Sequence, residues 1–475
     1  MEATVSHRSV LETGGRIRPR TRESDAPARR AEDAAARALR KIGRSVLAVG
    51  LLASAGVGLT PAAEPRPLEP LDLAALLVEA AESNPAILAL QARRRAAEHV
   101  PSQMRALPDP TVSVAYTNET FTDLTLGSTP DSSLVFAWTQ EVPYPGKRRL
   151  SEDVGRAGID VVARALDATR LRVAAEVKTT YARLFRLDRT ASILGENREL
   201  LRSYLGAARA RYETGEGILE NVLKAQTELT KIEADLAAVA QERRSAGVAL
   251  NAALGREADT PLGSASVLPV ATLPDRDSME RTALELSPDL LGLQAAARSE
   301  EARLDLARRE LKPDFMWGTS YMNRGGLDPM VTGMFGVRLP LYRKKKQAEA
   351  VVQTEHELEA ARWDVDWRRV QVLSEVRDLH ARAERAETLQ RFYLEGVLPQ
   401  ARGALDSAAA SYAVGQAEFI TLLDDFLTVL SYEVEYEVQR EEALQALAAL
   451  EPLTGAVLVQ PGAAEQAPES AGRIP

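Results

Sequence analysis

The chain has 475 residues, no cysteine, 45% hydrophobic and only 5% aromatic residues, and a formal net charge of −9. Without cysteine it can form no disulfide, thiolate metal site, cysteine nucleophile or lipid anchor on an N-terminal cysteine. The negative charge gives no reason to expect nucleic-acid binding, which needs a concentrated basic face. Because aromatic residues carry much of a compact core's buried area, their scarcity argues against large globular cores and leaves room for an extended repeat architecture.

The N-terminal segment 1–63 has the features of an extension that ends in an export signal. A basic stretch at 38–44 precedes an apolar run at 45–59, and small residues follow. This order predicts cleavage after Ala62 or Ala63. The alternative is a single membrane anchor, but the apolar run of about 15 residues is shorter than the roughly 20 that a spanning helix needs.

Long helices are predicted for the proline-free windows 146–260 and 341–398, which are rich in Ala, Leu, Glu and Arg. Apolar residues recur there every seven positions. The two registers are Leu166, Val173, Thr180, Leu187, Leu194, Leu201 and Ala208, and then Val351, Leu358, Val365, Val372, Leu379, Ala386 and Tyr393. A strict heptad predicts left-handed supercoiling, whereas a chance stripe would drift by about 20° per heptad. A helix from about 150 to 212 would be on the order of 90 Å long, which is a rod.

Each long helical window is interrupted by the same short motif. RYETGEGILENVL places Tyr212 and Gly215 where SYAVGQAEFITLL places Tyr412 and Gly415. Glycine is a poor residue inside a helix but a good left-handed cap at its end, and helical patterning resumes after both glycines. We therefore predict that each motif is the tip of a long α-hairpin. The alternative is a tolerated glycine that only kinks a helix, and two glycines in matching contexts favour the turn.

The duplication extends beyond the tips. ESNPAILALQARRRAAE matches ELSPDLLGLQAAARSEE, and ALPDPTVSVAYTN echoes ELKPDFMWGTSYMN. We predict two repeats, 64–260 and 261–455, each running helix, strand pair, long helix, tip and returning helix, with tips at 212–217 and 412–417. Residues 460–475 have a linker composition, and 456–475 are expected to form a disordered tail.

Four short segments between the helices alternate between apolar and polar residues, which is typical of strands. They are 111–117, 133–140, 314–322 and 331–339. The aromatic residues on their apolar faces include Tyr116, Phe136, Trp138, Phe315, Trp317 and Phe335.

These strands allow two interpretations. One is a small soluble sheet packed on the rods. The other is a membrane β-barrel whose aromatic residues face lipid. Strand edges must be closed in lipid, because each unpaired backbone group costs several kcal/mol, and four strands cannot close. Copies of the chain would then share one barrel, with eight strands from two copies or twelve from three. With an export signal and no apolar spanning helix in the mature chain, this pattern points to a bacterial outer membrane.

Both turns that lead from a strand into a long helix carry a basic cluster. The clusters are Lys147, Arg148 and Arg149 in VPYPGKRR, and Arg343, Lys344, Lys345 and Lys346 in LPLYRKKK. In a membrane protein they would lie at the inner headgroup layer and meet lipid phosphates. The alternative is a solvated charge run that keeps each helix start soluble.

Over about residues 70–455 the sequence resembles the TolC-type outer-membrane efflux proteins. The resemblance rests on the duplicated NP/SP helix start, LPDP before the first strand, VPYPGKR after the second, and the paired Tyr-x-x-Gly tips. The resemblance implies a mainly α fold in which duplicated long α-hairpins form a periplasmic α-barrel. It also implies a homotrimer in which each chain gives four strands to a twelve-stranded β-barrel, located in the outer membrane and extending into the periplasm of a Gram-negative bacterium. The wording ALPDP, PYPGKR and LKPDF looks most like the heavy-metal branch of the family.

The resemblance also assigns partners and docking residues. In this family the Tyr-x-x-Gly turns lie at the periplasmic end, where a hairpin of the membrane-fusion adaptor docks. The residues carried over are Tyr212, Gly215, Tyr412 and Gly415. An inner-membrane pump, proton-driven or of ABC type, would supply the energy for transport.

Family members often carry acidic residues six and nine positions after the tip glycine, where the tunnel narrows. Here the first motif holds Asn221 and Lys224 at these positions, and the second holds Thr421 and Asp424. Only Asp424 matches, with Asp425 beside it. Three copies of Asp424 would form an acidic ring that favours cations, and the alternative is an ordinary solvated helix carboxylate.

Motifs of catalysis are missing from the sequence. There is no Gly-rich phosphate-binding loop with lysine, no H-E-x-x-H and no G-x-S-x-G elbow. The four histidines, His7, His99, His356 and His380, are scattered. We therefore expect no enzyme activity, no cofactor and no resident metal.

The sequence thus predicts the trimeric outer-membrane channel of a tripartite efflux system, with metal cations among its candidate substrates. Two alternatives stay open. One is a secreted or periplasmic coiled-coil scaffold without a pore, and the other is the outer-membrane channel of a type I protein secretion system.

Overall fold

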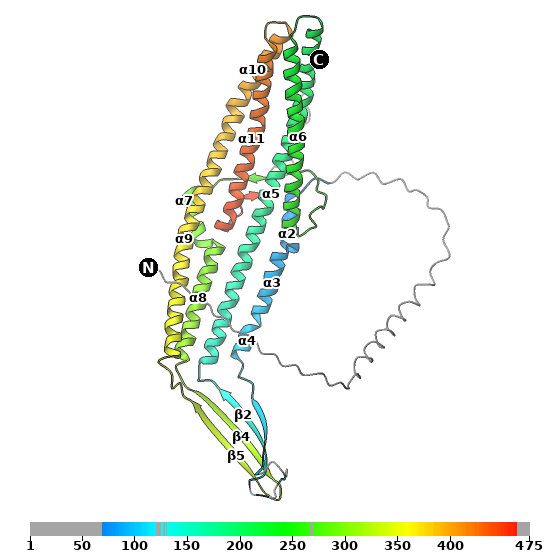
Figure 1. Ribbon diagram of the computed structural model, residues 1–475. Coiled ribbons are helices and arrows are strands. Elements are labelled where there is room, and N and C mark those ends of the chain that lie inside the picture. The colour runs from blue at the N-terminus through cyan, green and yellow to red at the C-terminus, as the bar shows by residue number, and fades with distance from the viewer. Residues whose placement is uncertain (1–68, 120–124, 127–128, 130, 267–268, 463–475) are drawn as a thin grey trace, which may run out of the picture. The chain divides into compact units, whose positions relative to one another are not determined.

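A computed structural model describes residues 69–462 except 120–124, 127–128, 130 and 267–268, so the predicted export signal lies outside the described residues. Along them, the same succession of elements occurs twice (Figure 1). The first half consists of α2 (Leu73–Ser83), α3 (Pro85–Glu98), α4 (Val100–Arg105), β1 (Thr111–Thr117), β2 (Ser133–Val142), α5 (Lys147–Glu213) and α6 (Leu219–Leu254). The second half consists of α7 (Arg276–Leu286), α8 (Pro288–Arg309), β4 (Asp314–Arg324), β5 (Leu327–Arg338), α9 (Gln347–Phe392), η1 (Tyr393–Val397), α10 (Leu398–Ala413) and α11 (Phe419–Thr454).

Corresponding helices in the two halves begin and end in the same way. Helices α3 and α8 both start with a proline after a polar residue, Asn84 or Ser287, although only the Asn84 side chain accepts hydrogen bonds from the first turn. The returning helices α6 and α11 end at Gly255 and Gly455, whose φ angles are 73° and 67°. Glycine is the residue that adopts this left-handed cap without steric cost, so the chain can leave both helices at the same point.

The long helices pack along their predicted heptad stripes. Helix α5 has 67 residues and is therefore roughly 100 Å long. Every predicted heptad position on α5 is buried except Thr180, which is half-buried. On the second rod Leu358, Val372 and Ala386 are buried and the other four positions are half-buried. Because α5 packs against α6 and α11, and α9 packs against α8 and α11, the stripes mark where neighbouring rods touch.

The second outgoing rod changes its winding instead of stopping at Pro399. The N–H of Leu398 donates to the carbonyl of Tyr393, five residues earlier, which makes η1 a π-helical turn between α9 and α10. A proline in a regular α-helix lacks a donor and clashes with the carbonyl four residues before it. The wider π turn just before the proline accommodates this defect, so the rod continues to the second tip.

The apolar side chains form three clusters instead of one core. One joins α2 and α3 to α5 and the end of α6 around Tyr181 and Leu184. A second lies toward the hairpin turns and joins α5, α6, α10 and α11 around Leu201 and Phe426. The third joins α7, α9 and α11 around Val376. In a bundle of long, thin helices, each segment along the bundle buries its own apolar stripe in a narrow core. Such a core has room for few large aromatic residues.

The strands form one antiparallel sheet in the order β1-β2-β4-β5. The first strand has its predicted bounds, whereas β2, β4 and β5 are longer than expected. The predicted polar connection 323–329 shrinks to a tight turn at Gly325, whose φ is 62°. The side chain of Asn323 accepts the Gly325 N–H at 2.9 Å, and five residues of the predicted connection belong to the strands, namely 323 and 324 to β4 and 327–329 to β5.

A second small sheet was not predicted. Strand β3 (Val270–Ala271), in the connection between α6 and α7, pairs with β6 (Val459–Gln460). The expectation of a disordered tail from 456 is therefore wrong for 456–462, while 463–475 lie outside the described residues. The linker composition begins only at Gln460, and the apolar residues before it pair with a distant strand.

A buried ion pair holds this C-terminal segment in place. Lys178 Nζ lies 2.8 and 2.6 Å from the two carboxylate oxygens of Glu451, and both side chains are almost fully buried. One oxygen of Glu451 also accepts the N–H groups of Leu458 and Val459, each at 2.8 Å. Both charges are thus compensated inside the protein, which is the condition for burying them at tolerable cost.

Candidate docking and channel surfaces

The two hairpin tips have the same backbone geometry. In each, the glycine N–H donates to the tyrosine carbonyl at 3.1 Å, and the next N–H donates to the carbonyl of the residue before the tyrosine at 2.9 Å. Gly215 and Gly415 have φ angles of 79° and 78°. A Cβ added at either position would meet no atom within 4 Å. The backbone conformation, and not a lack of space, is therefore what requires glycine there, and both turns leave their outer surface open.

The side chains of the two tips differ, although the sequence motifs match. Arg211 reaches from the end of α5 to the second tip, where it donates to the carbonyls of Tyr412 and Ala413. Its guanidinium lies 4.3 Å from the centre of the Tyr412 ring. The Tyr412 ring also packs against Phe419, with ring centres 5.6 Å apart, and Tyr412 is only 7% exposed, whereas Tyr212 is 45% exposed. Burial raises the pKa of Tyr412, and the Arg211 charge partly opposes this shift.

Sequence reasoning treated the two tyrosines as equivalent and missed Arg211. The signal was present, because the residue before the tyrosine is arginine in the first motif and serine in the second. Ser411 is too short to make the reciprocal contact with a neighbouring tip. The structure thus separates a buried tyrosine from an exposed one, and Tyr212 is the one that a partner can reach.

Beyond the tips, helices α6 and α11 border a groove. Its apolar lining comes from Leu219, Leu223, Ile420, Leu423 and Leu427, and its polar lining from Glu220, Lys224, Thr227, Glu228 and Asp424. The only cation there, Lys224, pairs with Glu220 at 2.8 Å and lowers the pKa of that carboxyl through the hydrogen bond.

The acidic candidates lie at this groove. Asp424 is exposed and has no ion-pair partner within the described part of the chain, while Asp425 is half-buried and outside the groove lining. The charge of Asp424 is therefore unneutralised in the single chain. Whether three copies approach one another is a question of assembly, so the acidic ring stays a prediction.

The sheet has one apolar face. Directly opposed residues of an antiparallel sheet share a face, and the register places Phe136 opposite Tyr321 and Trp317 opposite Phe335. The aromatic residues predicted on this face all lie on it, and Phe335 is 72% exposed. Trp138 and Phe315 are half-buried and contact neighbouring rings, with Trp138 at 4.7 Å from Trp317 and Phe315 at 6.2 Å from both Phe335 and Tyr144. Their contact with lipid stays a prediction.

Both outer edges of this sheet are unpaired. Among the described residues β1 pairs only with β2, and β5 only with β4. Strand β5 runs for twelve residues, from Leu327 to Arg338, and along this length its outward backbone groups can pair with another strand. An edge of this kind is a template for another strand, so the sheet is incomplete within one chain.

The basic residues predicted to face lipid headgroups do not form one class. Lys147 is buried, and its ammonium lies 3.1 Å from Glu310 and 2.8 Å from Asp314. Its assignment to the headgroup layer is therefore wrong: the lysine joins the start of α5 to the start of β4. The physical reason is that two carboxylates from the other repeat converge on it, which the local sequence cannot show.

The remaining basic residues stay available to solvent to different degrees. Arg148 is half-buried and donates to the Arg105 carbonyl at 2.6 Å, whereas Arg149 is exposed. In the second cluster Arg343, Lys344, Lys345 and Lys346 are all exposed. Contact between these side chains and lipid stays a prediction.

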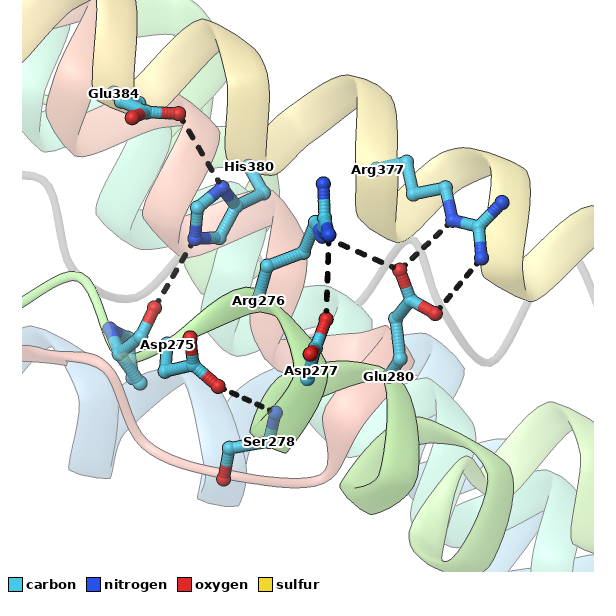
Figure 2. A network of polar contacts seen from close by, with 9 residues as sticks. Asp275, Arg276, Asp277, Ser278, Glu280, Arg377, His380 and Glu384 are labelled. Atoms are coloured by element: carbon cyan, nitrogen blue, oxygen red, sulfur yellow. Dashed lines mark hydrogen bonds and ion pairs between the residues drawn. The ribbon is translucent and has the colours of Figure 1, made fainter.

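A polar network joins the short helix α7 to the rod α9 (Figure 2). Arg377 on α9 donates to both carboxylate oxygens of Glu280 on α7, at 2.8 and 3.0 Å, and these bonds lower the pKa of Glu280. His380, one turn along α9, lies 3.1 Å from the carbonyl of Pro274. The network fixes the position of α7, and its acidic and basic groups are largely paired with one another.

Histidine and carboxylate positions do not indicate a metal centre. No group of three or more His, Asp or Glu side chains with metal-binding geometry occurs within residues 69–462, leaving out the undescribed gaps. Separately, within the same residues, no helix taken alone combines the length and hydropathy of a membrane span, and the pair Leu73–Ser83 and Pro85–Arg105, bent by 43°, meets that test only jointly.

Comparison with known families gives a direct match. The family model described as outer membrane efflux protein matches residues 76–256 and 281–456, which are the two repeats. The chain belongs to the outer membrane efflux protein family. Its predicted resemblance to this family is confirmed, and membership places the chain in the outer membrane. No curated protein matches the sequence.

Several solved structures share the fold of this family member. The outer membrane protein VceC from Vibrio cholerae is 18% identical, with a TM-score of 0.68 over 81% of this chain and 96% of that one. The CmeC outer membrane channel of Campylobacter jejuni is 13% identical, with a TM-score of 0.68 over 81% and 85%. CusC is 15% identical, with a TM-score of 0.69 over 84% and 95%. At these identities the likeness establishes the fold alone, and it confirms the predicted fold class of duplicated α-hairpins with a small β part.

Proposed function

We propose that this outer membrane efflux protein is the channel of a tripartite efflux system and works as a homotrimer. The observation that carries the proposal is the incomplete sheet, with two unpaired edges and an exposed aromatic face. In lipid, the edge of β5 must pair with another strand, and the free edge of β1 in a second copy supplies one. Three chains of four strands then close a twelve-stranded barrel.

The helical part offers a matching contact between copies. On α9, the rod that follows β5, Trp363, Trp367 and Val370 are 65%, 62% and 60% exposed. Their spacing of four and three residues places them on one side of the helix. Two exposed tryptophans in a stripe are typical of a protein–protein contact, because large aromatic side chains are costly to leave in water. A repeated head-to-tail contact of this kind closes into a ring.

The partners follow from the opposite end of the rods. The tips carry the exposed Tyr212 and the open surfaces of Gly215 and Gly415, where we propose that the hairpin of a periplasmic adaptor docks. An inner-membrane pump, proton-driven or of ABC type, then supplies energy through that adaptor. The basic residues after β5 lie at the sheet–helix junction, where the inner headgroup layer would be. The exposed Asp424 near the tips gives the entrance a preference for cations, with metal cations as candidate cargo.

Family membership does not support the alternative function, a coiled-coil scaffold without a pore. The solved relatives are described as outer membrane channels, which agrees with the expectation that the chain has no enzyme activity. The type I secretion channel shares the same architecture, so the structure does not favour it over efflux, and the experiment has to separate them.

The decisive experiment combines assembly and conduction. Purified protein in detergent should have the mass of a trimer, and it should produce stable ion conductance in planar bilayers. A variant with Trp363→Ser and Trp367→Ser should lose both, while an exposed polar control, Arg369→Ser on the same helix, should keep both. A stable wild-type monomer without conductance would contradict the proposal. A deletion strain distinguishes efflux from secretion: poorer growth on metals or drugs indicates efflux, and loss of a secreted polypeptide indicates type I secretion.

A further inference from the structure

The second face of the sheet carries an unusual set of side chains. Four of the seven methionines in the sequence lie on β4 and β5, and the register places all four on the face opposite the aromatic one. They are Met316, Met322, Met330 and Met334. The rest of this face is mostly small or polar, with Ser113, Thr139, Ser320 and Thr332 among its members.

The register arranges these methionines as two pairs. Met322 lies directly opposite Met330. Met316 lies opposite Gly336, and Met334 lies opposite Gly318, so Met316 and Met334 are diagonal neighbours. Directly opposed Cβ atoms in such a sheet are about 5 Å apart and diagonal ones about 7–8 Å, so two methionine side chains of either pair can reach one ion.

The two glycines leave room for the methionines of the first pair. A Cβ at Gly336 would lie 2.9 Å from the sulfur of Met316 and 2.7 Å from its Cγ. A Cβ at Gly318 would lie 3.4 Å from the terminal methyl of Met334. Each methionine therefore leans across onto the partner strand over a residue without a side chain. This geometry directs both thioethers toward the space between β4 and β5.

Ordinary core packing does not explain this set. Met330 and Met334 are each 48% exposed, so little apolar area is buried by either. The other large apolar residues of this sheet lie mostly on the aromatic face, with Val135, opposite Met322, as an exception. A thioether on a polar face offers one property that leucine or isoleucine lacks, a soft sulfur ligand. Thioethers select soft ions such as Cu(I), whereas carboxylates and water suit Mg²⁺.

We propose that the four methionines bind soft monovalent cations, Cu(I) or Ag(I), at two positions along the channel wall. The placement on the channel wall rests on the proposed function, because the aromatic face then meets lipid and the methionine face lines the lumen. The first position, Met316 with Met334, has Glu141 opposite Met316, in an ion pair with Arg338. At the second position the Arg324 guanidinium lies 3.6 Å from the sulfur of Met330 and competes with a cation. The first pair is therefore the stronger site.

The test measures metal binding by the purified full-length protein in detergent. Silver nitrate in chloride-free buffer is the probe, and bound metal is determined after equilibrium dialysis. Met316→Leu with Met334→Leu conserves volume but removes both sulfurs, and it should weaken Ag(I) binding by about tenfold or more. The pair Met322→Leu with Met330→Leu should have a smaller effect. Met104→Leu, outside the sheet, is the matched control and should bind like wild type.

Two outcomes would overturn the inference. One is a wild-type protein that binds no Ag(I) at micromolar concentration, and the other is a Met316→Leu/Met334→Leu variant that binds Ag(I) as wild type does. Zn²⁺ binding should not differ among the variants, since a loss of both metals would indicate general damage to the sheet and count against a thioether site.

Potassium conductance of the same preparations separates this inference from the proposed function. If conductance is normal but Ag(I) binding does not depend on the methionines, the cation site is rejected and the channel function still stands. If Ag(I) binding depends on the methionines but the protein neither trimerises nor conducts, the proposed channel function is rejected and the soft-cation site on the sheet still stands.

Discussion

Arg211 covers the ring of Tyr412 at 4.3 Å and also donates to the carbonyls of the second tip, so the two hairpin turns of one chain are joined by a single side chain. No equivalent contact starts from the second tip, where Ser411 occupies the corresponding position. The contact between the two tips of the chain is therefore asymmetric, although the two backbone turns match.

Replacing Arg211 with alanine should loosen the second tip. Loss of a cation–π contact worth about 0.5–1 kcal/mol, together with the hydrogen bonds, should raise the amide exchange rate of residues 409–418 several-fold. Hydrogen–deuterium exchange followed by mass spectrometry measures this. Arg209→Ala, an exposed change on the same helix, is the control, and equal exchange in the two variants would remove the role of Arg211.

Substituting leucine for both Gly215 and Gly415 should abolish efflux without abolishing trimers. Each leucine would have to adopt positive φ at a cost of roughly 1–2 kcal/mol and would cover the open surface of the tip. Resistance of the host strain and trimer mass are the two measurements. Gly206→Leu with Gly403→Leu, at helical positions that are equally free of neighbours, is the control. Full efflux by the tip variant would contradict the docking assignment.

Asp424→Asn should weaken the preference of the channel for cations. The carboxylate is exposed at the groove between α6 and α11 and has no ion-pair partner within the described residues, so its charge acts on passing ions. The reversal potential under a potassium chloride gradient in planar bilayers measures the change, with Asp406→Asn on α10 as the control. An unshifted reversal potential for Asp424→Asn would show that the side chain does not face the conduction path.

Lys178→Met should destabilise the protein strongly, because it leaves Glu451 buried and charged without its partner. Loss of one member of such a pair costs about 3–5 kcal/mol. Adding Glu451→Gln should restore part of the stability, since the amide oxygen still accepts the N–H groups of Leu458 and Val459. Thermal unfolding provides the comparison, with the exposed Lys231→Met as control. A single variant as stable as wild type would show that the pair contributes little.

The contact between Glu280 and Arg377 predicts a pH-dependent contribution to stability. The hydrogen bonds hold the pKa of Glu280 in the folded protein below its usual value of 4.5. A carboxyl with a lowered folded pKa stabilises the protein above the unfolded pKa and loses this effect as pH falls through the folded pKa. The melting temperature of wild type should thus exceed that of Glu280→Gln at neutral pH, and the difference should vanish in acid. Glu301→Gln, at an exposed carboxyl without an ion-pair partner in the described part of the chain, is the control.

Much of the fold was predictable because the spacing of apolar residues along each segment indicates its secondary structure. The heptad residues from Leu166 to Ala208 and the alternation around Val112 and Val114 each report the environment of their own segment, and a helix or strand expresses such a pattern directly. The positive φ angles of the tip glycines belong to the same category, since glycine between helical segments has few other uses.

Apart from the strand lengths at the β4–β5 hairpin, the errors concern contacts between distant segments. Lys147 belongs to a basic cluster in sequence but meets Glu310 and Asp314 in space. Val459 belongs to the segment expected to be a disordered tail, but it is buried and pairs with Ala271 of β3. The carboxylates that meet Lys147 lie in the other repeat, and the strand that pairs with Val459 lies in the connection between α6 and α7, so no window of neighbouring residues contains either partner.

The sequence by itself determined the rods, the turns, the four strands and the family, because periodicity and glycine placement act over a few residues at a time. Only the tertiary structure decided which of two matching tyrosines is buried, which basic residue is neutralised and which face of the sheet carries the methionines. These properties depend on register and on charges brought together from segments far apart in the chain, and such distances are fixed only when the rods pack.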